Sequence, residues 1–426
     1  MTAGMTRVQE TLRRSFCAVA VLSTLGATAL GAAPTAAAQD VRSKQWYLDA
    51  MHAEEIWKKA TGEGIKVAVI DSGVNAATPS LKGQVLKGKD LTDRSGDETS
   101  DYDGHGTNMA ELIAGTGKGG GIQGLAPGAK IIPFRIQVGL PKGAINRGSI
   151  PNAIKAAGDS DAQIISMSIG SEYFGAQEEE AIKYARSQGK LLLAAAGNNA
   201  KEGNGKSYPA AYPEVVGVAA TGPDGKVADY SQHGEVIDLA APANEIPLWC
   251  DATFKSYCDS NGGTSSATAI ASASAALIWS ANPDWTANQV LRVMIESAGR
   301  GEDWPEGPSN YLGHGIVRPG AHINRGIGKP GAPDIDPLTN EKTGGGNASD
   351  TSGSSDKGGS DSSTSESSEP ASSQPGQDGS DDDTAVAGSD KTGNDGGSTG
   401  LLIAGAAAVA ALGGAGFFIL RRRRTA

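Results

Sequence analysis

The chain has 426 residues, of which 38% are hydrophobic and 20% are charged, and its formal net charge at pH 7 is −11. Residues 334–400 alone contain 14 Asp and Glu against 3 Lys, so the acidity belongs to this segment and the rest of the chain is close to neutral. The net charge therefore says nothing about a basic or acidic binding face on the folded part, and we expect no nucleic-acid partner.

The first 38 residues have the layout of a secretory signal peptide. Arg7, Arg13 and Arg14 precede an apolar run over residues 15–33, and small residues at 36 and 38 fit cleavage after Ala38. Sec and twin-arginine export both stay open, and a retained N-terminal anchor is the alternative.

Short β-rich runs alternate with helical stretches between residues 64 and 325. The predicted strands are 66–70, 130–136, 163–169, 190–195 and 215–219. The predicted helices are 106–117, 149–158, 175–188, 264–281 and 286–298. This alternation predicts an α/β fold with a doubly wound, mainly parallel sheet and helices on both faces. We assign residues 39–63 to an N-terminal extension and residues 64–325 to the folded domain.

Four short glycine-containing motifs place polar residues at the ends of these elements. In chain order they are I-D-S-G with Asp71, D-G-H-G-T with His105, A-A-G-N with Asn198 and G-T-S-S-A with Ser265. Asp71 and Asn198 follow predicted strands, whereas His105 and Ser265 begin predicted helices. Because ligands bind outside the carboxyl ends of strands in such sheets, we expect the four side chains to converge on one rim.

An acid, a base and a hydroxyl in this arrangement predict nucleophilic catalysis. A serine hydroxyl is a weak nucleophile until a neighbouring imidazole accepts its proton, and a carboxylate fixes the tautomer of that imidazole. The backbone N–H of Ser265 and the side-chain amide of Asn198 would stabilise the negative oxygen that develops on the substrate.

The four motifs resemble the signature blocks of the subtilisin-like serine proteases, the subtilases, and the resemblance covers residues 64–324. The order Asp…His…Ser is also that of subtilisin. The resemblance implies a serine endopeptidase that cleaves proteins or peptides, with Asp71, His105 and Ser265 as catalytic triad and Asn198 as oxyanion donor. It implies no required cofactor. Calcium supports many subtilases, but we see no calcium loop and predict no metal ligands.

Other positions are judged against the same family. Ser168, Ile169 and Gly170 resemble the subtilase strand that pairs with substrate backbone. Asn108 stands where members often have His, and Ala269 where they often have Pro. Neither position belongs to the triad, so we expect altered rather than lost activity.

Once the predicted signal peptide is removed, the chain contains two cysteines, Cys250 and Cys258. An even pair in an exported chain predicts a disulfide, with two free buried thiols as the alternative. The loop that it would close is short, so its entropic contribution to stability is roughly 2.5 kcal/mol.

The C-terminal part is predicted to be a tether. Residues 326–400 are rich in Ser, Gly and Asp and poor in apolar residues, which predicts a disordered linker. Residues 401–420 carry no charge and would span about 30 Å as a helix, which predicts one transmembrane helix. The basic tail, 421–426, would lie in the cytoplasm and the catalytic domain outside the cell membrane.

The signal peptide, cysteine pair, linker and terminal helix together resemble the mycosins, membrane-anchored subtilases associated with type VII secretion in actinobacteria. The short distance from Gln39 to Trp46 also leaves no room for the long folding pro-domain of many subtilases. The resemblance implies the type VII secretion machinery as a partner. Two other functions stay open: a structural scaffold subunit of a secretion complex with dispensable proteolysis, and a general degradative surface protease.

Some competing patterns have weaker support. Ser266 could replace Ser265 in register, but the Gly-Thr-Ser spacing favours Ser265. His314 is a rival base without an acidic partner in view. A G-x-G-x-x-G pattern at 119–124 follows a predicted helix where a dinucleotide site needs a strand. A G-x-S-x-G pattern at 396–400 lies in the predicted linker.

Overall fold

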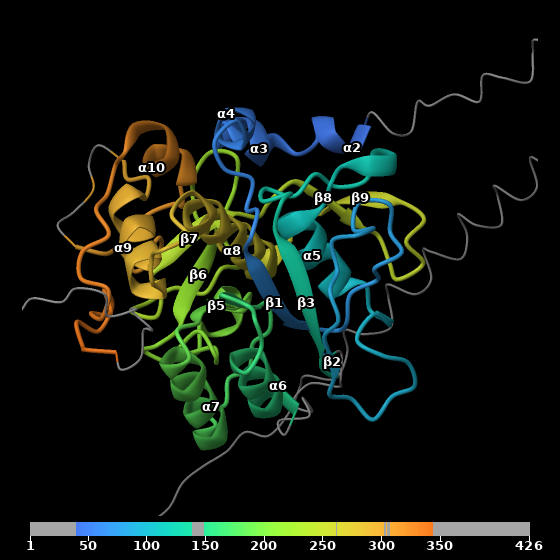
Figure 1. Cartoon of the computed structure of the whole chain (residues 1–426), viewed down its shortest axis with the longest axis horizontal. Helices are drawn as coiled ribbons and strands as arrows, with labels where there is room; N and C mark the ends of the chain where they lie inside the picture. The colour runs from blue at the N-terminus through green and yellow to red at the C-terminus, as the bar shows by residue number, and fades with distance from the viewer. Residues whose placement is uncertain (1–39, 139–148, 261, 302–303, 305–306, 344–426) are drawn as a thin grey trace, which may run out of the picture. The chain divides into compact units, whose positions relative to one another are not determined.

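The computed structural model describes residues 40–138, 149–260, 262–301, 304 and 307–343. Its centre is a seven-stranded parallel sheet in the order β2-β3-β1-β4-β5-β6-β7 (Figure 1). The strands are β1 (Lys66–Asp71), β2 (Lys89–Asp90), β3 (Lys130–Arg135), β4 (Ile164–Met167), β5 (Leu191–Ala195), β6 (Val216–Thr221) and β7 (Leu239–Pro242). The longer helices are α5 (His105–Ala114), α6 (Ser149–Gly158), α7 (Ala176–Ser187), α8 (Gly263–Ala281) and α9 (Ala287–Ser297). The predicted α/β fold with a mainly parallel sheet is confirmed.

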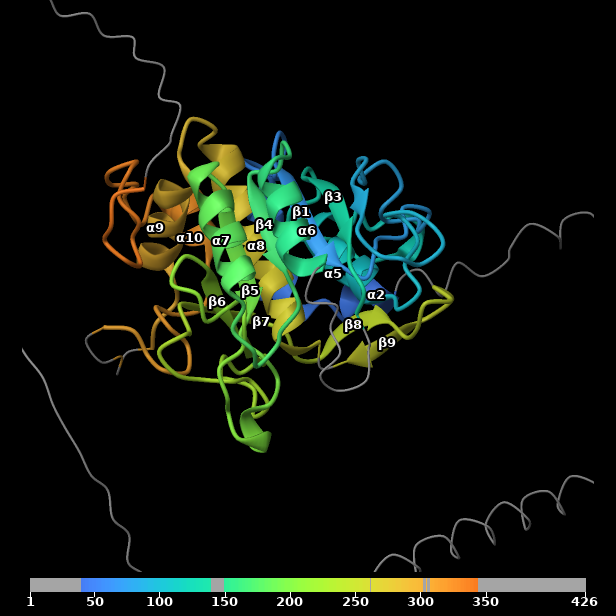
Figure 2. The same ribbon diagram turned by 90° about the horizontal axis from the view of Figure 1, so that it is seen from below.

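Helices cover both faces of this sheet. Val67 and Val69 of β1 enter the core that α5, α8 and α9 share, whereas Ala68 and Ile70 enter the core on the side of α6 and α7. Figure 1 shows α6 and α7 together below the strands, and Figure 2 views the domain from that side. Because both faces are buried, the strands are nearly continuous apolar runs. The sequence therefore predicts β1, β3, β4, β5 and β6 to within two residues at each end, whereas β2 and β7 were not predicted.

Helix α8 lies inside the domain. All its residues from Gly263 to Trp279 are buried, and it packs against β4, β5, β6 and β7. The helix consists largely of Ala, Ser, Thr and Gly, so its backbone can approach the sheet closely. Its amino-terminal end is thereby fixed against the carboxyl ends of the central strands.

The strand order changes direction at β1, and this determines where a ligand can bind. From β1 the chain passes through α5 to β3 on one side, then through α6 on the opposite face to β4 on the other side of β1. The loops after β1 and β4 therefore diverge, and the crevice between them is the general ligand site of open α/β sheets. Asp71 ends β1, and Ser168 directly follows β4.

The predicted N-terminal extension is folded onto the domain. It forms α2 (Asp40–Ser43), α3 (Trp46–Ala50) and α4 (Ala53–Trp57). Trp46 Nε1 donates to the Asn244 carbonyl at 2.9 Å, and Trp57 Nε1 donates to the Leu125 carbonyl at 2.8 Å. Two partly buried hydrogen bonds from large aromatic side chains hold this segment against the body.

Strands β8 (Ile246–Trp249) and β9 (Tyr257–Ser260) form a separate antiparallel hairpin. A disulfide joins Cys250 to Cys258 across it, with the two Cα atoms 5.1 Å apart. This disulfide-closed hairpin, residues 246–260, leads directly into α8.

The predicted start of the disordered linker at residue 326 is wrong. Residues 326–343, which we name the C-terminal strap, follow α10 (Pro319–Arg325) and pack against the body. Asp336 forms a buried ion pair with Arg186 of α7, and Asn288 of α9 donates to Thr343 Oγ1 at 2.7 Å. Composition fails here because a few specific polar contacts, together with the packing of Leu338 against the core, hold a strap that is poor in apolar residues.

Several predicted segments lie outside the described residues: the signal peptide (1–38), the linker from residue 344, the transmembrane helix (401–420) and the basic tail (421–426). In the part of the chain that the structure describes, no helix combines the length and apolar character needed to cross a bilayer.

Candidate active site

Asp71 and His105 form a hydrogen-bonded pair in the crevice. Asp71 is fully buried at the end of β1, and His105 is the first residue of α5, with a side chain that is 34% exposed. His105 Nδ1 lies 2.8 and 2.9 Å from the two carboxylate oxygens of Asp71. This arrangement leaves Nε2 of the imidazole available for a second partner.

Small and polar residues allow the two segments to approach so closely. A Cβ atom on Gly106 would lie 2.2 Å from a main-chain oxygen of the loop after β1, so no larger residue fits. The N–H of Gly106 donates to Ser72 Oγ at 2.9 Å. The buried carboxylate of Asp101 accepts from Ser72 Oγ at 2.9 Å and from the Thr107 hydroxyl at 2.6 Å. The Asp71 loop and the start of α5 are therefore held as one unit.

Ser265 reaches the same crevice from the start of α8. It is 9% exposed, whereas Ser266 is fully buried and its hydroxyl has no hydrogen-bond partner among the described residues. Ser265 Oγ donates to the Ser168 carbonyl at 3.2 Å, and Ser168 Oγ donates to the Ser265 carbonyl at 2.9 Å. Within the described residues the Ser265 hydroxyl thus bonds to Ser168 and not to His105. It has to turn before His105 can accept its proton.

Asn198, which follows β5, is fixed beside the start of α8. Its Oδ1 accepts from the N–H and the hydroxyl of Thr264 at 2.9 and 3.0 Å. The Thr264 hydroxyl also accepts from the N–H of Gly197 at 3.1 Å. Oδ1 is thus occupied, whereas Nδ2 of Asn198 has no hydrogen-bond partner among the described residues. Thr264, to which the amide is bonded, directly precedes Ser265 in the chain. Two N–H donors on adjacent segments can stabilise a developing oxyanion.

The segment after β4 offers an open edge. The main-chain groups of Ile169 and Gly170 make no hydrogen bond within the described part of the chain. A pocket of about 260 Å³ lies beside them and beside His105. Its apolar lining comes from Ile136, Val138, Ile150 and Ile169. An extended peptide can hydrogen-bond to such an edge and place an apolar side chain in the pocket.

The charges near His105 determine its protonation. Burial, the largest single effect, lowers the pKa of the imidazole, but the charge and hydrogen bond of Asp71, together with the charges of Asp103 and Asp101, more than offset it. The resulting pKa is about 9, above the usual 6.5. An imidazolium between these carboxylates is therefore strongly stabilised.

The structure also locates the rival base His314 and two residues, Asp101 and Thr264, to which the sequence analysis gave no role. The rival base His314 lies away from the pair: its N–H donates to the Asp238 carbonyl at 2.6 Å, and burial and Arg300 lower its pKa. The sequence analysis did not assign a positioning role to Asp101 or Thr264. The one signal in the sequence was their place, Asp101 shortly before the motif of His105 and Thr264 within the motif of Ser265. In the described part of the chain no three His, Cys, Asp or Glu side chains gather as metal ligands.

Comparisons with known proteins agree with this geometry. The family model described as the subtilase family matches residues 62–315. The major intracellular serine protease of Bacillus subtilis is 38% identical over 217 residues, 49% of this chain and 67% of that protein. Thermitase of Thermoactinomyces vulgaris is 33% identical over 277 residues, 63% of this chain and 94% of that protein.

Solved structures of two secretion-associated proteases are also similar. MycP1 from Mycobacterium smegmatis has a TM-score of 0.56 at 26% identity, covering 68% of this chain and 86% of that chain. MycP3 protease from the type VII (ESX-3) secretion system has a TM-score of 0.55 at 28% identity, covering 65% of this chain and 87% of that chain. One description of MycP1 names it an essential component of the type VII (ESX-1) secretion system.

Proposed function

This chain belongs to the subtilase family of serine endopeptidases, and on that premise we propose that Asp71, His105 and Ser265 are its catalytic triad. The observation that carries the proposal is the 2.8 Å contact between His105 Nδ1 and Asp71, in the crevice that Ser265 enters from α8. Asp71 keeps the proton on Nδ1, so that Nε2 is the basic nitrogen when His105 is neutral.

Acylation starts when the Ser265 hydroxyl turns from the Ser168 carbonyl to His105 Nε2. His105 accepts the proton as Ser265 Oγ attacks the scissile carbonyl, and it then donates that proton to the leaving amine as the C–N bond breaks. A water molecule hydrolyses the acyl-enzyme by the same sequence of proton transfers. His105 can act only when neutral, so its raised pKa predicts activity that increases into the alkaline range.

The Ser265 N–H and Asn198 Nδ2 hold the oxyanion in this proposal. Thr264 supports the assignment, because its two hydrogen bonds to Asn198 Oδ1 direct the amide nitrogen outward before substrate arrives. A donor that is already oriented needs no reorganisation as the negative charge develops.

The open edge formed by Ser168, Ile169 and Gly170 would bind the substrate backbone as an added β-strand. The apolar pocket of about 260 Å³ beside this edge favours substrates with an apolar side chain near the scissile bond.

We further infer a membrane-anchored, extracytoplasmic protease that serves type VII secretion. The signal-peptide layout of residues 1–38 and the apolar run 401–420 followed by four Arg support the location. The disulfide between Cys250 and Cys258 suits an oxidising compartment. The likeness to MycP1 and MycP3, which are described as parts of type VII secretion systems, supports the secretion role. That role predicts a small set of protein substrates.

The test is labelling of the full chain, in membranes or detergent, with a fluorophosphonate probe that phosphonylates activated serines. We expect wild-type protein to be labelled, Ser265→Ala not to be labelled, and Ser266→Ala to be labelled like wild type. Ser266 is the matched control, because its buried hydroxyl makes no hydrogen bond within the described residues. An unlabelled, folded wild-type protein would contradict the proposal.

A secretion scaffold with dispensable proteolysis is the competing function. A deletion strain complemented with Ser265→Ala separates the two, because a scaffold would still restore secretion whereas an essential protease would not.

A further inference from the structure

We propose that the disulfide-closed hairpin sets the position of His105 relative to Ser265, with Asn108 of α5 as the positioning residue. The inference rests on the proposed function, because it concerns the same triad. It assigns a role in the reaction to a surface hairpin and to a residue that touches neither substrate nor the reacting atoms.

The first contact joins the hairpin to the helix that bears His105. Asn108 lies one turn after His105 and is 8% exposed. Its Oδ1 accepts from the N–H of Trp249 at 2.7 Å, and its Nδ2 lies 3.5 Å from the Trp249 carbonyl. A side-chain amide that meets both main-chain groups of one residue fixes the separation and the angle between helix and strand.

A second contact lies further along α5. The hydroxyl of Tyr257 in β9 donates to Glu111 Oε2 at 3.0 Å, and Ser80 Oγ donates to Glu111 Oε1 at 2.6 Å. The rings of Trp249 and Tyr257 stack with centroids 3.8 Å apart. Both residues that contact α5 therefore move together, and breaking one contact leaves a buried polar group without its partner.

The hairpin also lies against the turn just before His105. A Cβ atom on Gly104 would be 3.3 Å from the main-chain nitrogen of Ala252, in the loop between β8 and β9. Gly104 has φ of 89°, and its lack of a side chain lets the loop rest on the first turn of α5. The turn before α5 and two residues of α5, Asn108 and Glu111, thus contact the same hairpin.

At its other end the hairpin continues into the nucleophile helix. β9 ends at Ser260 and α8 begins at Gly263, two residues before Ser265. The N–H of Gly262 donates to the Ala243 carbonyl at 2.9 Å, which fixes this short connection near the start of β8. The hairpin therefore contacts α5, which bears His105, and continues into α8, which bears Ser265, in addition to the direct packing of α5 on α8.

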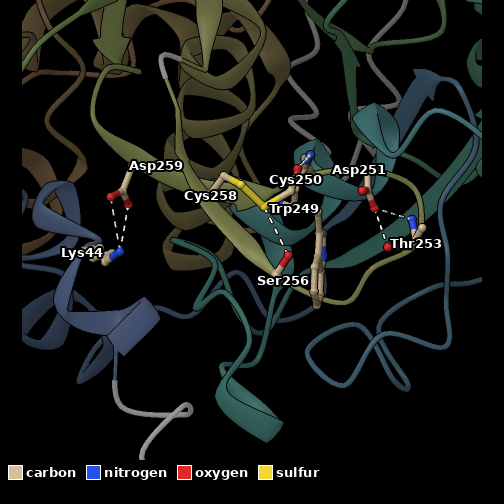
Figure 3. The surroundings of a disulfide bond; sticks show 9 residues. Lys44, Trp249, Cys250, Asp251, Thr253, Ser256, Cys258 and Asp259 are labelled. Atoms are coloured by element: carbon tan, nitrogen blue, oxygen red, sulfur yellow. Dashed lines mark hydrogen bonds and ion pairs between the residues drawn. A yellow bond between two sulfur atoms is a disulfide. The ribbon is translucent and has the colours of Figure 1, made fainter. Parts of the chain in front are cut away.

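The disulfide makes this link rigid. Cys250 and Cys258 are the immediate neighbours of Trp249 and Tyr257, and Leu248 pairs with Cys258 in the ladder. Figure 3 shows the Lys44–Asp259 ion pair on one side of the disulfide and Trp249 on the other. The cross-link thus fixes the register of the two residues that contact α5. A hairpin of two short strands is marginally stable without such support.

Separate contacts hold His105 to Asp71. These are the pair itself, the Gly106–Ser72 bond and the Thr107–Asp101 bonds, and none involves the hairpin. Loosening the hairpin should therefore misalign His105 and Ser265 while leaving the Asp71–His105 pair intact. The rate of serine modification should fall, and the pH at which His105 titrates should stay the same.

The experiment measures the second-order rate of fluorophosphonate labelling of the full chain as a function of pH. Asn108→Ala and the double variant Cys250→Ser/Cys258→Ser should each react about 10- to 100-fold more slowly, with the midpoint of the pH profile unchanged. Combining them should cause little further loss, because both act through one hairpin. A phosphine reductant should slow the wild type to the same degree and leave the double serine variant unaffected.

Two further variants keep the test decisive. Asp259→Asn, on the same hairpin but in an exposed ion pair with Lys44, should react like wild type. Tyr257→Phe keeps the ring stack and removes the hydroxyl that bonds to Glu111. It tests the link if the larger changes impair folding, which thermal unfolding monitors.

The inference is overturned if folded Asn108→Ala or reduced wild type reacts within twofold of oxidised wild type, if the losses add, or if the pH midpoint moves. Failure of the proposed function has a different result: oxidised wild type would not react, or Ser265→Ala would react equally well.

Discussion

Removal of the Asp336 carboxylate should cost the domain a large part of its stability. The side chains of Arg186 and Asp336 are only 7% and 3% exposed, and Arg186 has one other side-chain acceptor, Asn288 Oδ1 at 2.9 Å. In Asp336→Ala the buried guanidinium loses its counter-charge, a change that destabilises proteins by about 3–5 kcal/mol. At about 2–4 °C per kcal/mol for a domain of this size, Tm should fall by about 6–20 °C.

The assay is thermal unfolding of the full chain followed by circular dichroism at neutral pH. Asp334→Ala is the matched control in the same strap, because its ion pair with Lys342 has side chains that are 45% and 75% exposed. It should cost no more than about 1 kcal/mol. Arg186→Met combined with Asp336→Leu should recover most of the loss, since an apolar pair of similar volume can replace a buried ion pair. A Tm for Asp336→Ala within 2 °C of wild type would refute the reasoning.

Four further predictions concern the site and the core. Labelling by fluorophosphonate should increase with pH about a midpoint above 6.5 and near 9, because protonated His105 cannot accept a proton; a midpoint at or below 6.5 contradicts this. Asp71→Asn should slow labelling by about 10⁴-fold and move the midpoint to lower pH, and an unshifted midpoint counts against the pairing. Asn198→Ala should lower turnover of a peptide substrate by about 10²–10³-fold with KM little changed, the size known for the corresponding donor in subtilisin; a loss confined to KM would exclude the oxyanion role. Burial raises the pKa of Glu178 from 4.5 to about 7, so this carboxyl favours the folded state below pH 4.5 and loses that contribution as the pH rises through 7. Glu178→Gln should therefore raise Tm at pH 8 and not at pH 4, and an equal gain at both pH values would argue against a titrating carboxyl.

Elements that are determined by a local sequence pattern, such as an apolar run or a glycine-containing motif at its end, could be predicted from the sequence. Strand β1 is an apolar run buried on both faces, and its end at Asp71 is marked by the Ser-Gly pair that follows, residues 72–73. The structure brings Asp71, His105, Ser265 and Asn198 to one crevice, as expected from element ends in a parallel sheet, whereas their chemical roles stay predictions.

Features that depend on distant partners could not be predicted. Strands β8 and β9 have only four residues each, and they exist through pairing with one another and packing on α5. The strap was assigned to the linker because Asp336 looks like any other acid in an acidic region, and its partner Arg186 lies 150 positions away. Asp101 is one of several acids in its loop, and only the fold shows that it supports α5.

The attachment of the strap has a mechanical consequence. Arg186 and Asn288 hold it on α7 and on the first turn of α9, which follows the carboxyl end of α8. Ser265 is at the opposite end of α8, and a helix of 19 residues is about 28 Å long. A pulling force that enters through the chain after Thr343 is therefore borne by an ion pair far from the nucleophile. We expect tension applied to the domain through the C-terminal part of the chain to leave the positions of His105 and Ser265 unchanged.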